Sequence, residues 1–401
     1  MIRPPKNPPP MTLDAEDLSS EKRKLIVHDA LVFLSLSLVT VALFVVTLLL
    51  FRSFAAHRSE LAIRWSGRGK AAIQAGHPEQ AISALRTALL YAPADRSYEL
   101  LLAQALGDAG HTEESYNYFL SLWDTQPGDG FINLRLARLA AKKHDQRGAV
   151  KYYRAAIYGT WEGDGALRRR DVRLELAQYL LDQHDSDDAR TELLIAGGNN
   201  PGDPALTLKL AGLLEKAGDP VNALAYYKKV IAAEPKNAQA LAAAGRLEFA
   251  AGQYDQSHRL LERADHETPA SSNPQGVSDL KAMLQKLERI LVLTPSKKLS
   301  ARVRVGRILF ARTIAKKRFT TCSAQMQQAG ASPAQLQVLS SAWTSKLASA
   351  TQKELLQDSD SQDATVKLIF DTETQTNQVC GPPSGDDALL LLLAQDTKSN
   401  D

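Results

Sequence analysis

The apolar positions of this chain follow three patterns along its length. Residues 30–51 form an unbroken run without a charged side chain. Between residues 62 and 271, small, large and helix-ending residues return at a fixed interval of 34. From residue 272 onward this interval is lost, although apolar residues keep the three-and-four spacing of helices that bury one face. We therefore expect an all-α protein with three regions.

The run at residues 30–51 is long enough to form a transmembrane helix. At about 1.5 Å per residue it would measure roughly 33 Å, and the hydrocarbon core of a bilayer is about 30 Å thick. A cleaved signal peptide has a shorter apolar region of about 7 to 15 residues that ends at a small-x-small site. This run instead ends at Phe51-Arg52-Ser53-Phe54. We expect an uncleaved anchor that places residues 30–51 in the lipid bilayer, after a disordered, proline-rich tail at residues 1–29.

The repeating interval defines six units, and each unit is expected to form a pair of antiparallel helices. The eighth and twentieth positions of the unit carry only Gly, Ala or Ser, which lets two helix backbones approach closely. These small residues are Gly69, Ala81, Ala103, Ser115, Ala137, Ala149, Ala177, Ala189, Ala211, Ala223, Gly245 and Ser257. The units span residues 62–95, 96–129, 130–163, 170–203, 204–237 and 238–271.

Two further positions mark the ends of the paired helices. At the fifteenth, the first helix ends and a residue that can take a positive φ is favoured. The residues at this position are Gly76, Gly110, His144, His184, Gly218 and Gly252. The thirty-second position is proline in five units, because proline ends the second helix. The third unit carries Trp161 there, next to an insertion at residues 164–169.

This pattern resembles the tetratricopeptide repeat (TPR), and Trp65 matches the aromatic residue near the start of the family's unit. The resemblance covers slightly more than half of the chain. It implies a right-handed superhelix of six helix pairs, whose concave groove binds a peptide or another protein. It implies an architecture and no reaction.

The resemblance also implies which side chains face the groove, and these mix apolar and basic groups. They are Ser66, Lys70, Ile73, Gln104, Phe131, Arg138, Gln178, Arg246 and Phe249. Such a lining would suit an amphipathic or acidic segment of a partner protein. The alternative is that these residues only solvate or close the superhelix. TPR modules that clamp a C-terminal carboxylate carry Lys and Asn where this chain has Ser66 and Lys70, so that role is not implied.

Residues 272–401 are expected to form a helical C-terminal cap with segregated charge. Twelve Lys or Arg and no acid lie between Arg289 and Lys353, and acids dominate the segment that follows. The basic residues alternate with apolar ones and no aromatic platform accompanies them, so we expect a packed helix with a solvated basic face. Together with a net charge of only +3, this makes nucleic acid an unexpected partner.

No catalytic, cofactor or metal site is predicted. The histidines His77, His111, His144 and His184 recur at turns that whole repeats separate, so they cannot converge on one metal ion. The two cysteines, Cys322 and Cys380, leave two alternatives open: a disulfide if the region lies in an oxidising compartment, or two buried free thiols.

These patterns together predict a membrane-anchored, non-catalytic scaffold that captures a protein partner. The basic cluster at residues 22–24 lies on the short tail, which favours a cytoplasmic N-terminus with the repeats on the other side of the membrane. The general resemblance implies a bacterial inner-membrane protein with periplasmic repeats, acting in envelope assembly or secretion. One alternative is a docking receptor that faces the cytosol. Another makes residues 272–401 an independent enzymatic or lipid-binding domain. The sequence indicates neither the partner nor the oligomeric state.

Overall fold

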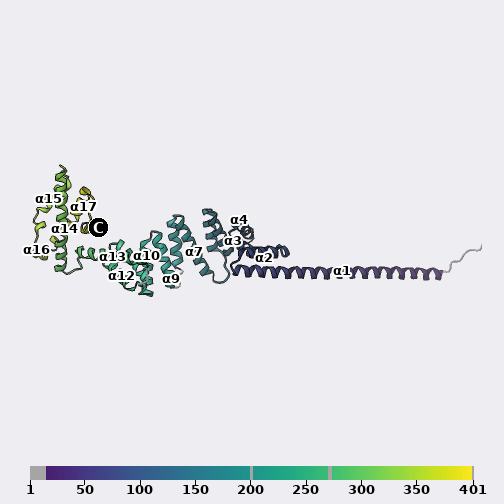
Figure 1. Ribbon diagram of the computed structural model, residues 1–401. Helices are drawn as coiled ribbons and strands as arrows, with labels where there is room; N and C mark the ends of the chain where they lie inside the picture. Colours follow the sequence, from purple (N-terminus) through teal and green to yellow (C-terminus); the bar gives the residue numbers. More distant parts are fainter. Residues whose placement is uncertain (1–14, 199–201, 270–272, 400–401) are drawn as a thin grey trace, which may run out of the picture. The chain divides into compact units, whose positions relative to one another are not determined.

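The computed structural model describes residues 15–198, 202–269 and 273–399, which form eighteen α-helices and one 3-10 turn (Figure 1). Over these residues the only β-type pairing is an isolated bridge between Asp129 and Thr160. The described residues up to Val172 form one compact unit, and those from Arg173 onward form a second. The predicted fold class, an all-α solenoid of helix pairs with further helices at its C-terminal end, is confirmed.

The first helix, α1 (Ala15–Gln74), is 60 residues long and contains both the expected span and the first helix of the first repeat. Residues 15–29 were expected in a disordered tail, but they are helical. No Gly or Pro occurs between Ala15 and Phe51, and Glu, Lys, Arg and Leu favour helix there. The same holds for residues 52–61, so no linker separates the span from the repeat. Residues 1–14 of the expected tail lie outside the described residues.

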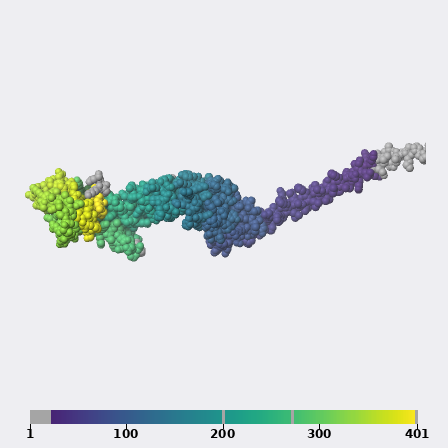
Figure 2. All heavy atoms as spheres, turned by 90° about the horizontal axis from the view of Figure 1, so that it is seen from above, coloured from purple at the N-terminus to yellow at the C-terminus, as the bar shows by residue number. Residues whose placement is uncertain are grey.

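The apolar part of α1 has no protein packed against it. Figure 2 shows this segment, in purple, with no other helix of its unit around it. By its length and composition α1 qualifies to cross a membrane, the one helix to do so in the part of the chain that the structure describes. A signal sequence near the N-terminus would have the same properties.

The C-terminal part of α1 begins a series of six antiparallel helix pairs. Its partner is α2 (Pro78–Tyr91). The other helices of the pairs are α3 (Arg96–Ala109), α4 (Thr112–Thr125), α5 (Gly130–Lys142), α6 (Gln146–Tyr158), α7 (Gly165–Asp182), α8 (Ser186–Gly198), α9 (Pro204–Lys216), α10 (Pro220–Ala233), α11 (Ala238–Ala250) and α12 (Tyr254–Glu267).

The twelve small residues of the repeat are all buried. Where the eighth position is glycine, the large residue at the twenty-fourth position fills the space. A Cβ built on Gly69 would lie 2.6 Å from Cγ of Leu85, and one on Gly245 would lie 2.6 Å from Cγ of Leu261. The paired helices therefore cross so closely that one methyl group more would displace a leucine that is completely buried.

The fifteenth position takes a positive φ in every unit. The four glycines have φ between 71° and 89°, and His144 and His184 have φ of 58° and 63°. Histidine tolerates this conformation better than most residues that carry a Cβ, although at a cost relative to glycine. The turn geometry thus stays constant where the residue type changes.

Trp161 and the insertion after it also have a structural account. The indole packs directly over Gly130, and its Nε1 donates to the carbonyl of Ala156 at 2.9 Å. Backbone hydrogen bonds of 2.8 Å join Gly130 to Thr160 and Thr160 to Gly128, so this loop lies against the preceding one. The insertion at residues 164–169 is helical rather than a loop, because the carboxylate of Asp164 caps an α7 that starts early, at Gly165.

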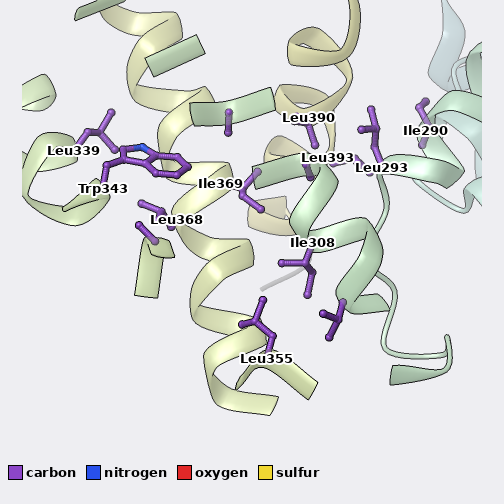
Figure 3. Packing of buried hydrophobic residues seen from close by; sticks show 14 of the residues in the cluster. Ile290, Leu293, Ile308, Leu339, Trp343, Leu355, Leu368, Ile369, Leu390 and Leu393 are labelled. Carbon is purple, nitrogen blue, oxygen red and sulfur yellow. The ribbon is translucent and has the colours of Figure 1, made fainter. Parts of the chain in front are cut away.

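The remaining helices continue the second unit. They are α13 (Pro274–Leu293), α14 (Ala301–Gln328), α15 (Ala334–Trp343), the 3-10 turn Leu347–Ser349, α16 (Gln352–Gln357), α17 (Ser359–Cys380) and α18 (Gly385–Ser399). Their apolar residues pack with Tyr254 and Leu261 of α12 in a single cluster. Figure 3 shows Ile308, Ile369 and Leu390 of three different helices pointing into it. The last repeat and the C-terminal helices therefore share one core.

We predict that Gly245→Val destabilises the sixth repeat by about 1–3 kcal/mol, because the added atoms overlap Leu261. Hydrogen exchange of α11 and α12 in the full chain in detergent measures the loss of protection. The matched control is Gly306→Val in α14, where an added Cβ meets nothing within 4 Å. Equal protection in both variants would contradict the close crossing at Gly245.

Candidate functional site

Six of the expected groove residues belong to the compact part of the chain that ends at Val172, and their side chains differ in exposure. Ser66 is buried and its hydroxyl donates to the carbonyl of Ile63 at 3.0 Å. Ile73 packs on the core of the first two repeats. Lys70 and Arg138 are exposed, and Gln104 and Phe131 are half-buried, as Ile73 is. Ser66 therefore supports its helix and offers little to a ligand.

The aromatic ring of Phe131 already has a cationic neighbour. The guanidinium of Arg135 lies 5.2 Å from the ring centroid, and its Nη1 is 3.6 Å from a carboxylate oxygen of Asp108. This contact fixes the ring at the second residue of α5. It leaves Phe131 half-buried, as a rigid apolar surface for a partner to pack on.

The other three expected groove residues lie in the compact part that begins at Arg173, and only one of them, Arg246, is exposed. Gln178 donates to Asp182 at 2.9 Å. Phe249 packs edge-on against Tyr254 at 5.4 Å, with the ammonium of Lys286 5.1 Å from its ring centroid. α13 therefore covers Phe249, which sequence reasoning had placed on an open groove. Arg246 is 51% exposed.

A slot of about 640 Å³ lies beside Arg246, between α11 and α13. Small side chains form its α11 wall, and α13 supplies a wall of larger apolar ones. The residues that carry this contrast are Ala238 and Ala242 on α11 and Val277, Leu280 and Met283 on α13. Gln239, Ala242 and Arg246 are the second, fifth and ninth residues of the sixth unit, positions that the resemblance assigns to the groove.

The polar end of the slot is held by a chain of contacts. The hydroxyl of Tyr227 donates to Glu215 at 2.9 Å, and the guanidinium of Arg246 lies 4.0 Å from the other oxygen of the same carboxylate. Burial, with a smaller effect from Glu215, raises the pKa of Tyr227, so this tyrosine stays protonated as a donor. Arg246 is held loosely at one edge and presents its other donors to the slot.

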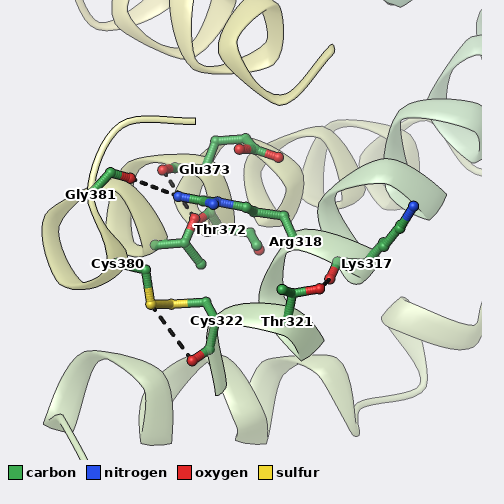
Figure 4. The surroundings of a disulfide bond; sticks show 9 residues. Lys317, Arg318, Thr321, Cys322, Thr372, Glu373, Cys380 and Gly381 are labelled. Carbon is green, nitrogen blue, oxygen red and sulfur yellow. Dashed lines mark hydrogen bonds between the residues drawn. A yellow bond between two sulfur atoms is a disulfide. The ribbon is translucent and has the colours of Figure 1, made fainter. Parts of the chain in front are cut away.

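A second polar cluster lies deep in the C-terminal helices, next to the disulfide that the structure places between Cys322 and Cys380 (Figure 4). Their Cα atoms are 5.9 Å apart. Arg318, one turn before Cys322, donates to the carbonyl of Gly381 at 2.7 Å. Glu373 is fully buried, and burial, followed by the charge of Asp387, raises its pKa to about 8.

This cluster has the character of a structural centre. The guanidinium of Arg318 opposes the upward shift in the pKa of Glu373 but does not cancel it. The described residues contain no group of three or more His, Cys, Asp or Glu that could hold a metal ion. The cluster joins α14, α17 and α18, and Glu373 and Asp387 lie within reach of each other and away from the slot.

Comparison with known proteins identifies the repeats. Models described as Tetratricopeptide repeat match residues 67–130, 174–238 and 214–284. The chain contains tetratricopeptide repeats. The last match runs past the sixth unit into α13, which the 34-residue frame had left out. No curated protein matches the chain.

Several solved structures resemble this chain. One comes from the characterisation of Pseudomonas aeruginosa PilF, with 18% identity and a TM-score of 0.39, covering 57% of this chain and 99% of that one. Another is YrrB, described as a TPR protein with an unusual peptide-binding site, with 16% identity and a TM-score of 0.39, covering 51% and 100%. A third is MamA from Desulfovibrio magneticus, with 15% identity and a TM-score of 0.37, covering 44% and 96%.

We predict that the C-terminal helices lose stability as pH rises towards 8. Glu373 keeps its proton in the folded state up to about pH 8, whereas the unfolded chain loses it near pH 4.3, so between these values folding binds a proton. The free energy of unfolding should fall by about 1.4 kcal/mol per pH unit from this group alone.

Glu373→Gln should remove most of that slope. Hydrogen exchange of α14 and α17 at pH 6, 7 and 8, corrected for the intrinsic rate, measures it. Glu288→Gln, which removes an exposed carboxyl on α13, is the control and should keep the slope of the parent chain. An unchanged slope in Glu373→Gln would show that Glu373 is ionised in the folded protein.

Proposed function

We propose that this chain is a membrane-anchored scaffold that binds an apolar segment of a partner protein in its TPR groove, with the slot between α11 and α13 as the principal site. The observation that carries the proposal is the slot itself. Its walls are mainly apolar, it opens at positions of the sixth repeat that the resemblance assigns to the concave face, and its lining includes the exposed side chains of Arg246 and Asp279. The proposed role involves no catalytic step.

The chemistry of the slot defines the segment that it would accept. Ala238 and Ala242 leave room for large side chains, and Leu280 and Met283 offer them an apolar wall. Burying one Leu, Met or Phe side chain of a partner contributes roughly 1.5–3 kcal/mol. A carboxylate next to that side chain would meet Arg246 as a charge-assisted hydrogen bond. We therefore infer a segment with neighbouring apolar and acidic residues, bound as a helix or an extended strand.

Anchoring through residues 30–51 would keep this groove at a membrane. The bare apolar surface of α1 and its continuity with the first repeat support an uncleaved anchor, since a cleaved signal sequence would not need to continue into a packed helix. The disulfide between Cys322 and Cys380 supports an oxidising compartment for the repeats, as in a bacterial periplasm. A role in envelope assembly or secretion agrees with that location.

A cytosol-facing receptor is the second candidate, because five basic residues lie between residues 52 and 70, after the span, whereas the cluster at residues 22–24 before it has three. The two candidates separate when a membrane-impermeant maleimide is applied to intact cells that carry Gly163→Cys in the exposed loop before α7. Labelling before lysis supports the periplasmic arrangement. Labelling only after lysis, together with reduced Cys322 and Cys380, supports the cytosolic one.

A third hypothesis, an independent enzymatic or lipid-binding domain at residues 272–401, finds no support in the packing. α13 and α18 share their core with Tyr254 and Leu261 of the sixth repeat. Arg289 of α13 donates through Nε and Nη2 to the two carboxylate oxygens of Asp386 in α18. A fragment that begins at residue 272 would therefore expose part of this core.

We predict that filling the slot abolishes partner binding. A photoreactive benzophenone residue at Gln239, on the rim of the slot, should give an ultraviolet-dependent adduct in cells. The same residue at Glu262, which is exposed on α12, is the control and should give none. Ala242→Trp, combined with the probe at Gln239, should reduce the adduct at least tenfold, because the indole occupies the space that the partner needs.

The variant needs a check of its own folding, which hydrogen exchange of α11 and α13 provides. An adduct from Gln239 that persists in a folded Ala242→Trp variant would refute the slot as the principal site. Equal adducts from Gln239 and Glu262 would indicate contact without a defined groove.

A further inference from the structure

The end of the first repeat that lies nearest to the anchor carries an unusual combination of side chains. Phe54 is 62% exposed and Leu90 is 76% exposed, although both belong to helices of the repeat array or lead into it. Arg58 lies between them, and its guanidinium is 5.9 Å from the ring of Phe54. The same guanidinium donates to the carbonyl of Tyr91 at 3.1 Å. We call Arg52, Phe54, Arg58, Leu90 and Tyr91 the anchor-proximal surface.

The continuity of α1 fixes how far this surface lies from the apolar run. Phe54 is three residues beyond Phe51 and Arg58 is seven, which correspond to about 5 Å and about 10 Å along the helix. The polar headgroup layer on each side of a bilayer is roughly 5–8 Å thick. α2 runs antiparallel to α1, so its last turn, with Leu90 and Tyr91, returns to the level of Arg58.

The charge of this surface is positive. Between Phe51 and Glu60 the chain carries Arg52, His57 and Arg58 and no acid. Glu60 is paired with Arg64 at 2.5 Å. The nearest acid after α2 is Asp95, whose carboxylate accepts from the backbone of Ser97 and Tyr98 as the cap of α3. The charge of Arg52 and Arg58 is therefore not balanced by an acid in this segment.

We propose that the anchor-proximal surface rests on an anionic bilayer, with Arg52 and Phe54 within the headgroup layer and Arg58, Leu90 and Tyr91 at its outer edge. The inference depends on the proposed anchoring through residues 30–51. Aromatic and aliphatic side chains favour the interface, and nearby arginines are attracted to anionic headgroups. The contact would give the first repeat a second attachment to the membrane and limit rotation and tilt of the span.

The test uses the full chain in vesicles of phosphatidylcholine with or without phosphatidylglycerol. Leu90→Cys is labelled with bimane while Cys322 and Cys380 remain joined, so that one site reacts. A nitroxide-bearing lipid then quenches the fluorophore if it lies in the interface. The control is His77→Cys, exposed at the opposite end of the same helix pair.

We expect quenching at position 90 several-fold stronger than at position 77, and stronger with phosphatidylglycerol than without it. Arg52→Gln should lower the quenching at position 90 in the anionic vesicles. Equal quenching at both positions, in a chain that resists carbonate extraction, overturns the surface contact and leaves the anchor intact. Quenching at position 90 that is equal with and without phosphatidylglycerol overturns the role of anionic lipid. Extraction by carbonate overturns the anchor and the inference together.

Discussion

The close crossing of paired helices is the constraint on which the repeat array depends. At the eighth and twentieth positions of each unit the side chain is Gly, Ala or Ser, and all twelve are buried. Gly69 and Gly245 lie against the side chains of Leu85 and Leu261. The large residue at the twenty-fourth position can therefore fill the core only where the residue at the eighth position is small. The close crossing in turn limits how the two helices of a unit can pack against each other.

This constraint explains how much of the fold the sequence predicts. A distance that every unit must keep leaves a periodic record, and so does a turn that requires a positive φ, even where His144 replaces glycine. The helix at residues 15–29 leaves no periodic pattern. Helix propensity was its only signal, and the prolines earlier in the tail favoured the prediction of disorder for the whole segment. The C-terminal helices show the right spacing of apolar residues, but helical spacing does not state which helices pair.

The candidate site was predictable only in part for the same reason. Arg246 occupies a position that the repeat assigns to the groove, and it lies at the edge of the slot. The opposite wall is α13, which lies outside the 34-residue frame. The repeat pattern therefore could not predict Val277 or Leu280 as lining residues. The same helix explains why Phe249, at a groove position, is covered. The array continues by one helix beyond its last full unit.

That continuation makes the C-terminal region part of the slot's lining. The face of α13 that carries Leu280 and Met283 lines the slot, and its last turns carry Leu287, Ile290 and Leu293 into the core shared with α14, α17 and α18. The slot therefore has one wall supplied by a repeat and one wall whose position depends on the C-terminal helices. The ion pair of Arg289 with Asp386 and the disulfide of Cys322 with Cys380 both stabilise those helices. The last third of the chain is therefore best understood as the support of one side of the groove.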